Sequence, residues 1–267
     1  MKIFTGIMLL SLALSPVLIR AEGDTTTLEV KAMLGGAYDE ASGLMNDTLR
    51  TSGFIPASEP YTALGYEFTQ IENKTISEGV LSVEGPDAIV DWVVVELRDR
   101  VQKKNILFST AALIQRDGDV VDVDGMSKIS VPLKTGKYFV GILHRNHLGA
   151  MIETPIEIEN PANFMLRKLF GSNKTPAKFV DGIQVLWPGD ANFDGVVRYV
   201  GLNNDTETVF ETIGGVLPTN VVNGYFGADI NMDGEVKFTG TNNDRDIILQ
   251  TLGGTTPTSV RRSQLPN

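Results

Sequence analysis

Short runs of apolar and β-branched residues dominate the chain from about residue 25 to residue 158. Thr25–Met33 alternates apolar and polar positions, which is typical of a strand with one buried face. Ile89–Leu97 is rich in β-branched and aromatic residues and predicts a central strand. The other predicted strands follow at short spacing and cover residues 105–115, 120–123, 128–133, 137–143 and 152–158. Such strands, with almost no helical periodicity between them, predict a mainly β chain whose first domain is a β-sandwich.

The stretch between the first two of these strands is irregular. Gly35–Gly53 predicts a loop with one short helical turn around Leu44–Leu49, and Pro56 and Pro60 exclude a regular helix after it. Asp117-Gly118, between two later strands, predicts a tight hairpin turn.

The C-terminal part of the chain repeats itself. The segment 190–195, with the sequence DANFDG, recurs 39 residues later at 229–234 as DINMDG. Each copy continues with a predicted short strand (196–199 or 235–238) and a predicted helix (205–213 or 244–252). Asn204 and Asn243, or the Asn before each of them, are suitable N-caps for these helices, and a Gly-Gly pair ends each helix. A repeat of this period predicts two copies of one small unit that bury a face against each other.

The repeated segment offers the oxygen atoms that calcium binds in proteins, roughly six to eight for each ion. Acidic or amide side chains stand at its first, third and fifth positions, and a glycine at the sixth position permits a sharp turn. The seventh residue would lend its backbone carbonyl. An EF-hand-type loop has its bidentate acid at position twelve, but here the next acid comes four residues later, where each helix starts, and we expect it to close the shell. The candidate ligands are Asp190, Asn192, Asp194, Val196 and Asp205 in the first copy, and Asp229, Asn231, Asp233, Glu235 and Asp244 in the second.

A single motif of this kind can also be a polar turn that holds no cation. Two copies in register, each followed by Asn-Asn-Asp and a capped helix, favour two calcium sites over that alternative.

This tandem resembles the type I dockerin repeat in the D-x-N-x-D-G motifs at 190–195 and 229–234. It differs at the twelfth position, where Gly201 and Gly240 stand, and in the basic residues Arg198 and Lys237. The resemblance implies two calcium loops, each followed by a helix, that pack with approximate two-fold symmetry.

The chain after its first residues is also similar, as a whole, to a module found near the ends of large exported proteins of Bacteroidetes, described as hemagglutinin-like or dockerin-like. The similarity lies in the segments 43–50, 59–62, 94–99, 115–125 and 144–149. It implies an extracellular β-domain with a tail that bound calcium stabilises. It indicates where the protein is located more firmly than which activity it has.

Lys2, the apolar run 7–19 and the small residue Ala21 are together typical of a signal peptide, which we place at residues 1–21. A buried N-terminal helix is the alternative. No later apolar run is long enough to span a membrane. We therefore expect a secreted, extracellular or cell-surface protein. Its expected parts are a β-sandwich-like domain at 22–159, a linker at 160–184 and the dockerin-like tandem calcium-binding domain at 185–260.

Charge and cysteine content narrow the function further. Met1–Ala21 carries Lys2 and Arg20 and no acid, so without it the net charge changes from −10 to −12. Such an acidic chain argues against nucleic acids and anionic membranes as partners. The absence of cysteine excludes disulfides, catalytic thiolates and cysteine-held zinc or iron–sulfur centres. Bound calcium is then the obvious means of stabilising a small exported repeat.

Other residues have competing interpretations. His144 and His147 would need a third ligand to hold zinc, and the alternative is a hydrogen-bonded pair or a loop that contacts a ligand. The four aspartates of the segment 117–124 could form a further calcium site, but a solvated hairpin is favoured. We expect Trp92 in the core and Trp187 at the junction of the two domains.

No serine-hydrolase, P-loop or dinucleotide-binding motif occurs, and nothing in the sequence pairs two carboxylates across a cleft, so an enzyme is disfavoured. We expect a non-enzymatic module for adhesion or assembly. The alternative is a carbohydrate-binding module, or a small glycan-active hydrolase, with a dockerin-like tail. Tyr38, Tyr61 and Tyr66 are candidates for a glycan-facing surface. The tandem repeat would bind either a protein partner or the chain's own β-domain.

Overall fold

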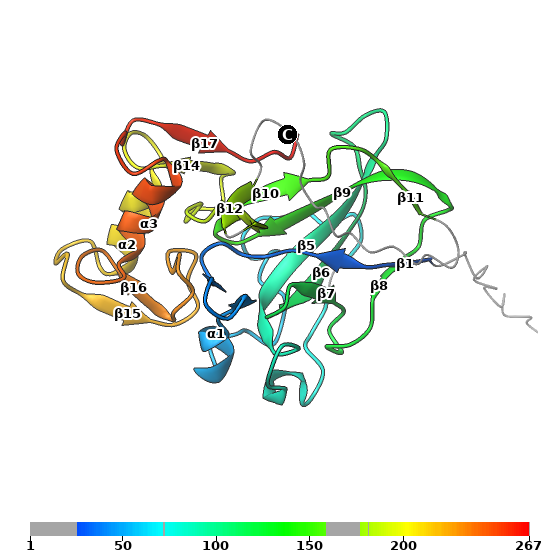
Figure 1. Cartoon of the computed structure of the whole chain (residues 1–267), viewed down its shortest axis with the longest axis horizontal. Coiled ribbons are helices and arrows are strands. Elements are labelled where there is room, and N and C mark those ends of the chain that lie inside the picture. Colours follow the sequence, from blue (N-terminus) through cyan, green and yellow to red (C-terminus); the bar gives the residue numbers. More distant parts are fainter. Residues whose placement is uncertain (1–25, 72, 159–176, 181, 267) are drawn as a thin grey trace, which may run out of the picture.

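The computed structural model describes residues 26–71, 73–158, 177–180 and 182–266 (Figure 1). Within them the protein is mainly β, as predicted, and its sheets are antiparallel. The predicted signal peptide (1–21) lies outside the described residues, as do 160–176 and 181 of the expected linker. The rest of that linker belongs to a hairpin of β12 (Ala177–Val180) and β13 (Ile183–Leu186).

A seven-stranded antiparallel sheet forms the centre of the structure. Its strand order is β10–β9–β5–β6–β7–β2, and β11 pairs with the other end of β9. We call described residues 26–158, which are built on this sheet, the β-domain. The strands are β2 (Val30–Lys31), β5 (Ile89–Asp99), β6 (Ile106–Gln115), β7 (Asp119–Val121), β9 (Gly136–His144), β10 (His147–Met151) and β11 (Ile156–Ile158).

In the main sheet, the strand predictions are confirmed within a few residues, with two differences. The predicted strand Thr25–Met33 is divided: β1 (Thr26–Leu28) pairs with β8 (Ile129–Val131), whereas β2 joins the main sheet. Strand β10 was not predicted. Strand β5 is buried along nearly its whole length, because its continuous apolar run is covered on both faces.

The irregular segment before β5 covers this central strand. It contains β3 (Tyr38–Asp39), β4 (Leu44–Met45), α1 (Thr48–Thr51) and the 3-10 turn η1 (Val80–Ser82). Tyr61 is fully buried there, and its hydroxyl donates a hydrogen bond to the carbonyl of Trp92 at 2.8 Å. Trp92 is a core residue, as expected, but the interpretation of Tyr61 as a glycan-facing residue is wrong.

Residues 187–266, which we call the tail, contain two copies of one strand–helix–strand unit. The first consists of β14 (Val196–Arg198), α2 (Asp205–Thr212) and β15 (Val221–Asn223), and the second of β16 (Glu235–Lys237), α3 (Asp244–Thr251) and β17 (Val260–Arg262). The copies exchange strands, because β14 pairs with β17 and β15 pairs with β16. Helices α2 and α3 lie side by side in Figure 1, and their equivalent residues Val209 and Ile248 are fully buried in one shared core. The predicted helices, caps and short strands of the repeat are confirmed.

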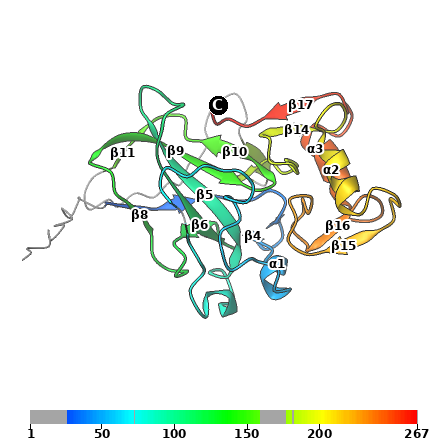
Figure 2. The same cartoon turned by 180° about the vertical axis from the view of Figure 1, so that it is seen from behind.

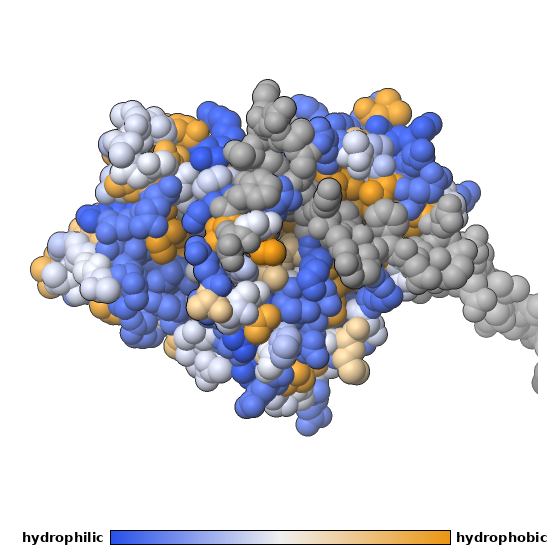
Figure 3. Space-filling view, in the orientation of Figure 1, coloured by the Kyte–Doolittle hydropathy of each residue, from blue (hydrophilic) through white to orange (hydrophobic). Residues whose placement is uncertain are grey.

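The tail lies at one end of the main sheet, beside β10 and α1, as the view from behind also shows (Figure 2). Its loops face the β-domain, and Figure 3 shows a mostly hydrophilic surface over the tail. Met232, the fourth residue of the second acidic loop, is fully buried in the core of the β-domain. Its equivalent Phe193 packs against Tyr61 with ring centroids 5.9 Å apart. Both have a left-handed backbone (φ 59°), which is uncommon outside glycine.

The burial of Met232 predicts that an acidic loop contributes to the stability of the β-domain. We expect Met232→Ala to lower the free energy of unfolding by about 2–5 kcal/mol, because it removes a buried side chain and leaves a cavity. The matched control is Met126→Ala, since the Met126 side chain is 82 % exposed and its loss should cost less than about 0.5 kcal/mol. Urea denaturation of the full chain measures both, and equal effects would contradict the packing described above.

Candidate functional site

The first acidic loop curls around its first residue. Asp190 is only 2 % exposed, and its carboxylate accepts hydrogen bonds from the backbone N–H groups of Asp194 and Gly195, each at 3.0 Å. Asn192 accepts a second bond from the N–H of Asp194 at 3.0 Å, and Asp194 accepts one from Val196 at 2.8 Å. Residues one, three and five therefore turn their oxygen atoms toward the inside of the loop.

The second loop has the same geometry. Asp229 is fully buried and accepts from Asp233 at 3.1 Å and from Gly234 at 3.0 Å. Asn231 and Asp233 accept from the backbone at positions five and seven, at 3.0 and 2.9 Å. The repeat in the sequence is thus also a repeat in hydrogen bonding.

The two displaced acids form hydrogen bonds to the loops. Asp205 is the first residue of α2, and its two carboxylate oxygens accept from the N–H groups of Ala191 at 2.8 Å and Arg198 at 2.7 Å. Asp244, the first residue of α3, makes the equivalent bonds to Ile230 at 2.7 Å and Lys237 at 2.8 Å. Each acid therefore joins both ends of its loop.

The helix caps fix these acids in place. The side chain of Asn204 accepts a hydrogen bond from the N–H of Glu207 at 2.9 Å, and that of Asn243 accepts from Asp246 at 3.0 Å. A cap of this kind sets the residue at which a helix begins. Because Asp205 and Asp244 follow the caps directly, their carboxylates project from a defined helix start.

Burial and mutual repulsion make these carboxylates unusually basic. Burial raises the pKa of Asp190 to about 8, and the negative charges of Asp205 and Asp194 add to the rise. Burial likewise raises the pKa of Asp205, Asp229 and Asp244 to about 7 in each case. Like charges brought together out of water disfavour ionisation, and a cation between them would remove that cost.

The donor set suits a hard cation, although it is not a cage of acids. Within the described residues, no group of three or more His, Asp or Glu side chains is placed so that it could hold a metal ion. A cation would therefore also need the amide of Asn192 and the carbonyl of Val196, and Asn231 and Glu235 in the second copy. All of these ligands are oxygen atoms, which calcium prefers.

A basic side chain at the ninth position stands beside each loop. Arg198 forms an ion pair with Asp194 at 2.7 Å, and Lys237 pairs with Glu235. Both pairs are partly exposed to solvent. A cation at either site would compete with them, and partly exposed pairs of this kind contribute little to stability.

The turn between β9 and β10, residues 144–147, connects the β-domain to both loops. The carbonyl of Asn146 accepts from the N–H groups of Gly189 at 2.9 Å and Asp190 at 3.1 Å. Its side-chain Nδ2 donates to the carbonyl of Asp229 at 2.5 Å. Asp190 and Asp229 are the first residues of the two loops, so one buried residue of the β-domain contacts the same position in both copies.

His144 and His147 are a buried hydrogen-bonded pair, which is one of the alternatives that the sequence left open. Their Nδ1 atoms are 3.0 Å apart, and Nε2 of His147 accepts from the N–H of Gly36 at 2.9 Å. Nε2 of His144 is 3.1 Å from Asp91 Oδ2. Burial lowers the pKa of both rings, and the charge of Arg145 lowers it further. The rings are therefore neutral and belong to the framework of the turn.

A buried ion pair holds this turn on β5. Nε of Arg145 lies 2.9 Å from Asp91 Oδ2, and the hydroxyl of Tyr225, from the tail, donates to Asp91 Oδ1 at 2.6 Å. Burial alone would raise the pKa of Asp91, but the charge of Arg145 and the hydrogen bond from His144 lower it to about 2. Arg145 also donates to the carbonyl of Phe226. Sequence reasoning missed these roles, and the only signal was a run of four polar residues directly after an apolar strand.

The remaining candidates have structural partners. Lys31 pairs with Asp117 at 3.1 Å and with Asp119 at 2.7 Å, which agrees with the favoured interpretation of that segment as a hairpin. Trp187 accepts a hydrogen bond from the N–H of Leu148 at 2.8 Å, so it lies at the predicted junction. The hydroxyl of Tyr66 donates to the buried carboxylate of Glu96 at 2.7 Å.

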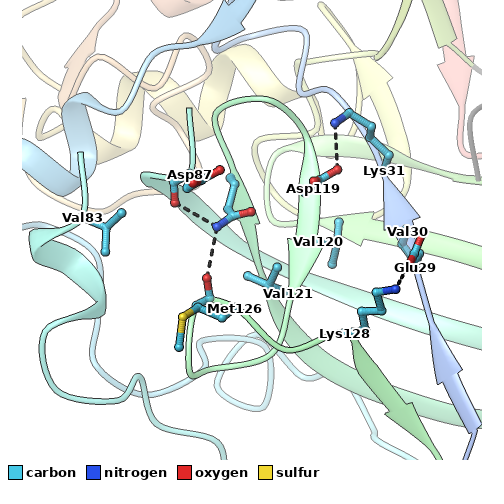
Figure 4. Close-up of a pocket in the computed structure, with 12 residues that line it drawn as sticks. Glu29, Val30, Lys31, Val83, Asp87, Asp119, Val120, Val121, Met126 and Lys128 are labelled. Atoms are coloured by element: carbon cyan, nitrogen blue, oxygen red, sulfur yellow. Dashed lines mark hydrogen bonds and ion pairs between the residues drawn. The ribbon is translucent and has the colours of Figure 1, made fainter. Parts of the chain in front are cut away.

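A cavity of about 520 Å³ in the β-domain is lined by the paired strands β2 and β7 and by neighbouring residues that include Val83 and Met126 (Figure 4). Lys31 and Asp119 pair on one side of it, and Lys128 pairs with Glu29. The amide of Gln115 donates to the carbonyl of Asp87 at 2.9 Å. Since these polar groups satisfy one another, the cavity presents no convergent set of reactive side chains.

Comparison of the chain with protein-family models, curated proteins and solved structures finds no match. None of the helices in the described part of the chain has the length and apolar character needed to cross a membrane.

The buried histidine pair predicts a loss of stability in weak acid. In the unfolded chain His147 binds a proton below about pH 6.5, whereas in the folded chain burial keeps its pKa well below that value. Its contribution to stability is therefore present above about pH 6.5 and is lost as the pH falls. Relative to His147→Gln, which does not titrate, the wild type should lose about 1.4 kcal/mol of unfolding free energy between pH 7.5 and pH 5.5. Urea denaturation at the two pH values measures this, and a difference between the two proteins that stays constant would refute it.

Proposed function

We propose that the protein is a non-enzymatic, secreted or cell-surface module for adhesion or assembly. Its mainly β domain, with a sandwich-like arrangement, carries a dockerin-like tail that binds two calcium ions. The ions are structural staples, and they replace the disulfides that a chain without cysteine cannot form.

The observation that carries the proposal is the equivalent hydrogen bonding, around the first aspartate, of two acidic loops 39 residues apart. In each loop a buried first aspartate is brought close to a second acid from a helix start, and both have a raised pKa. Metal-free folding therefore brings carboxylates together at a cost. A divalent cation that binds the folded loops stabilises the native state by mass action.

The contacts of the loops favour docking of the tail on its own β-domain. Phe193 and Met232 extend from the loops into contacts with that domain. The ions would therefore shape the face that the tail presents inward. A separate protein partner would have to use the outward surface of the tail.

A carbohydrate-binding module is the second candidate. Tyr38 lines a polar groove of about 750 Å³ between the β-domain and the second repeat, together with Asp39, Asn46 and Gln250. An aromatic ring beside several carboxylate and amide groups is a suitable lining for a sugar site. Binding of the full chain to a glycan array, lost in Tyr38→Ala, would favour this function, and turnover of a polysaccharide would favour a hydrolase.

Calorimetric titration of the full chain with calcium tests the main proposal. We expect a stoichiometry near two. For an extracellular-type dissociation constant of about 10⁻⁴–10⁻³ M, we also expect a rise in unfolding free energy of about 2.7 kcal/mol per site at a hundredfold excess over that constant. A chelator should reverse the rise.

The variant Asp194→Ala/Asp233→Ala should lose both the binding heat and the stabilisation. The control, Asp117→Ala/Asp119→Ala, removes the same charge from the hairpin of the β-domain and should keep both. An unchanged response of the loop variant to calcium would contradict the two proposed calcium sites.

A further inference from the structure

The two acidic loops are joined through a single residue of the β-domain, which contacts one loop with its backbone and the other with its side chain. The carbonyl of Asn146 accepts from the N–H of Asp190 at 3.1 Å, and its amide Nδ2 donates to the carbonyl of Asp229 at 2.5 Å. The amide is held in this orientation from behind, because its Oδ1 lies 2.7 Å from Nδ1 of His147. Asn146 is fully buried, so solvent does not compete for these bonds.

We propose that Asn146 couples the two calcium sites, so that occupation of one loop raises the affinity of the other. This inference rests on the proposed calcium function. In each loop the first aspartate is both a candidate ligand and a backbone contact of Asn146. A cation that fixes the carboxylate of Asp190 also fixes its N–H against the Asn146 carbonyl. The amide of Asn146 then holds the carbonyl of Asp229 in the position that the second site requires.

The two copies of the repeat are also in direct contact with each other. The experiment must distinguish this contact from the connection through Asn146. The copies share a core around Val209 and Ile248, and they exchange strands in the pairs β14–β17 and β15–β16. No strand of one acidic loop pairs with the strand of the other, since β14 and β16 have different partners. Substitution of Asn146 breaks the bridge at its side-chain bond to Asp229. The backbone contact to Asp190, the shared core and the exchanged strands stay in place.

A double-mutant cycle in the full chain measures the coupling. Asp194→Ala disables the first site, and calorimetry with calcium gives the affinity of the second site with and without it. In the wild-type background we expect Asp194→Ala to lower the calcium affinity of the second site about fivefold or more. In the Asn146→Ala background we expect the same substitution to lower that affinity less than about twofold. Asn46→Ala is the matched control, because it removes an amide contact of 3.4 Å to Asn231 in the second loop alone and should leave the fivefold effect.

The possible results distinguish a failure of the proposed coupling from a failure of the proposed calcium binding. If the wild type binds no calcium, the proposed function fails and the coupling falls with it. If two ions bind but Asp194→Ala leaves the second site unchanged, the coupling alone is overturned. An equal effect of Asp194→Ala with and without Asn146 would show that the coupling uses the shared core, which also overturns the role of Asn146.

If the alanine variant fails to fold, the second variant is Asn146→Leu, which keeps the number and branching of the side-chain heavy atoms and removes the amide. If neither variant folds, amide hydrogen exchange tests the coupling in the Asp194→Ala variant, in which calcium can bind only to the second loop. Filling it should slow exchange at the N–H groups of Gly189 and Asp190, which bond to Asn146. Unchanged exchange at both would overturn the inference.

Discussion

The contacts that the turn 144–147 makes with the tail depend on the buried ion pair of Asp91 and Arg145. Asp91 lies on the central strand β5, and it is fully buried with hydrogen bonds from His144, Arg145 and Tyr225. Replacing one partner of such a pair leaves an uncompensated charge in the interior, at a cost of about 3–5 kcal/mol. The pair therefore fixes the turn 144–147, and the turn in turn fixes the backbone at the start of both acidic loops.

Close backbone approach at the junction imposes a second constraint. A Cβ atom at Gly36 would overlap the carbonyl oxygen of Ile230 across the junction. Within the tail, a Cβ atom at Gly227 would lie 2.6 Å from the carbonyl oxygen of Ala191. Only glycine allows the segments to meet at this distance. Phe193 and Met232, which pack against the β-domain, lie next to these contacts. One side of each acidic loop is therefore buried. The geometry of the acidic loops and their packing against the β-domain are therefore parts of one arrangement.

Sequence patterns could predict those features that depend on nearby residues. Alternation and β-branched runs located most strands, and the Asn caps and Gly-Gly ends located both helices of the repeat. The period of 39 residues also placed Asp205 and Asp244 at their loops. These features could be inferred because a local hydrogen bond or turn decides each of them.

Features that depend on distant segments escaped prediction. Strand β10 has the short sequence HLGAM, and the tail supplies part of its burial through Leu148. Tyr61 lies in an irregular segment rich in turns, where nothing local shows that its ring fits beneath β5. The role of Asn146 requires three segments, at 146, 190 and 229, to meet in space. The secondary-structure propensities of neighbouring residues carry no information on such long-range contacts.

The central claim is that the acidic loops and the β-domain form one cooperative unit that calcium stabilises. Native-state hydrogen exchange of the full chain, with calcium and with a chelator, tests it most directly, because exchange reports local stability segment by segment. The account predicts that removal of calcium accelerates exchange in the loops 190–205 and 229–244 and also in the turn 144–147 and the central strand β5. Faster exchange confined to the tail, with the turn and β5 unchanged, would contradict it.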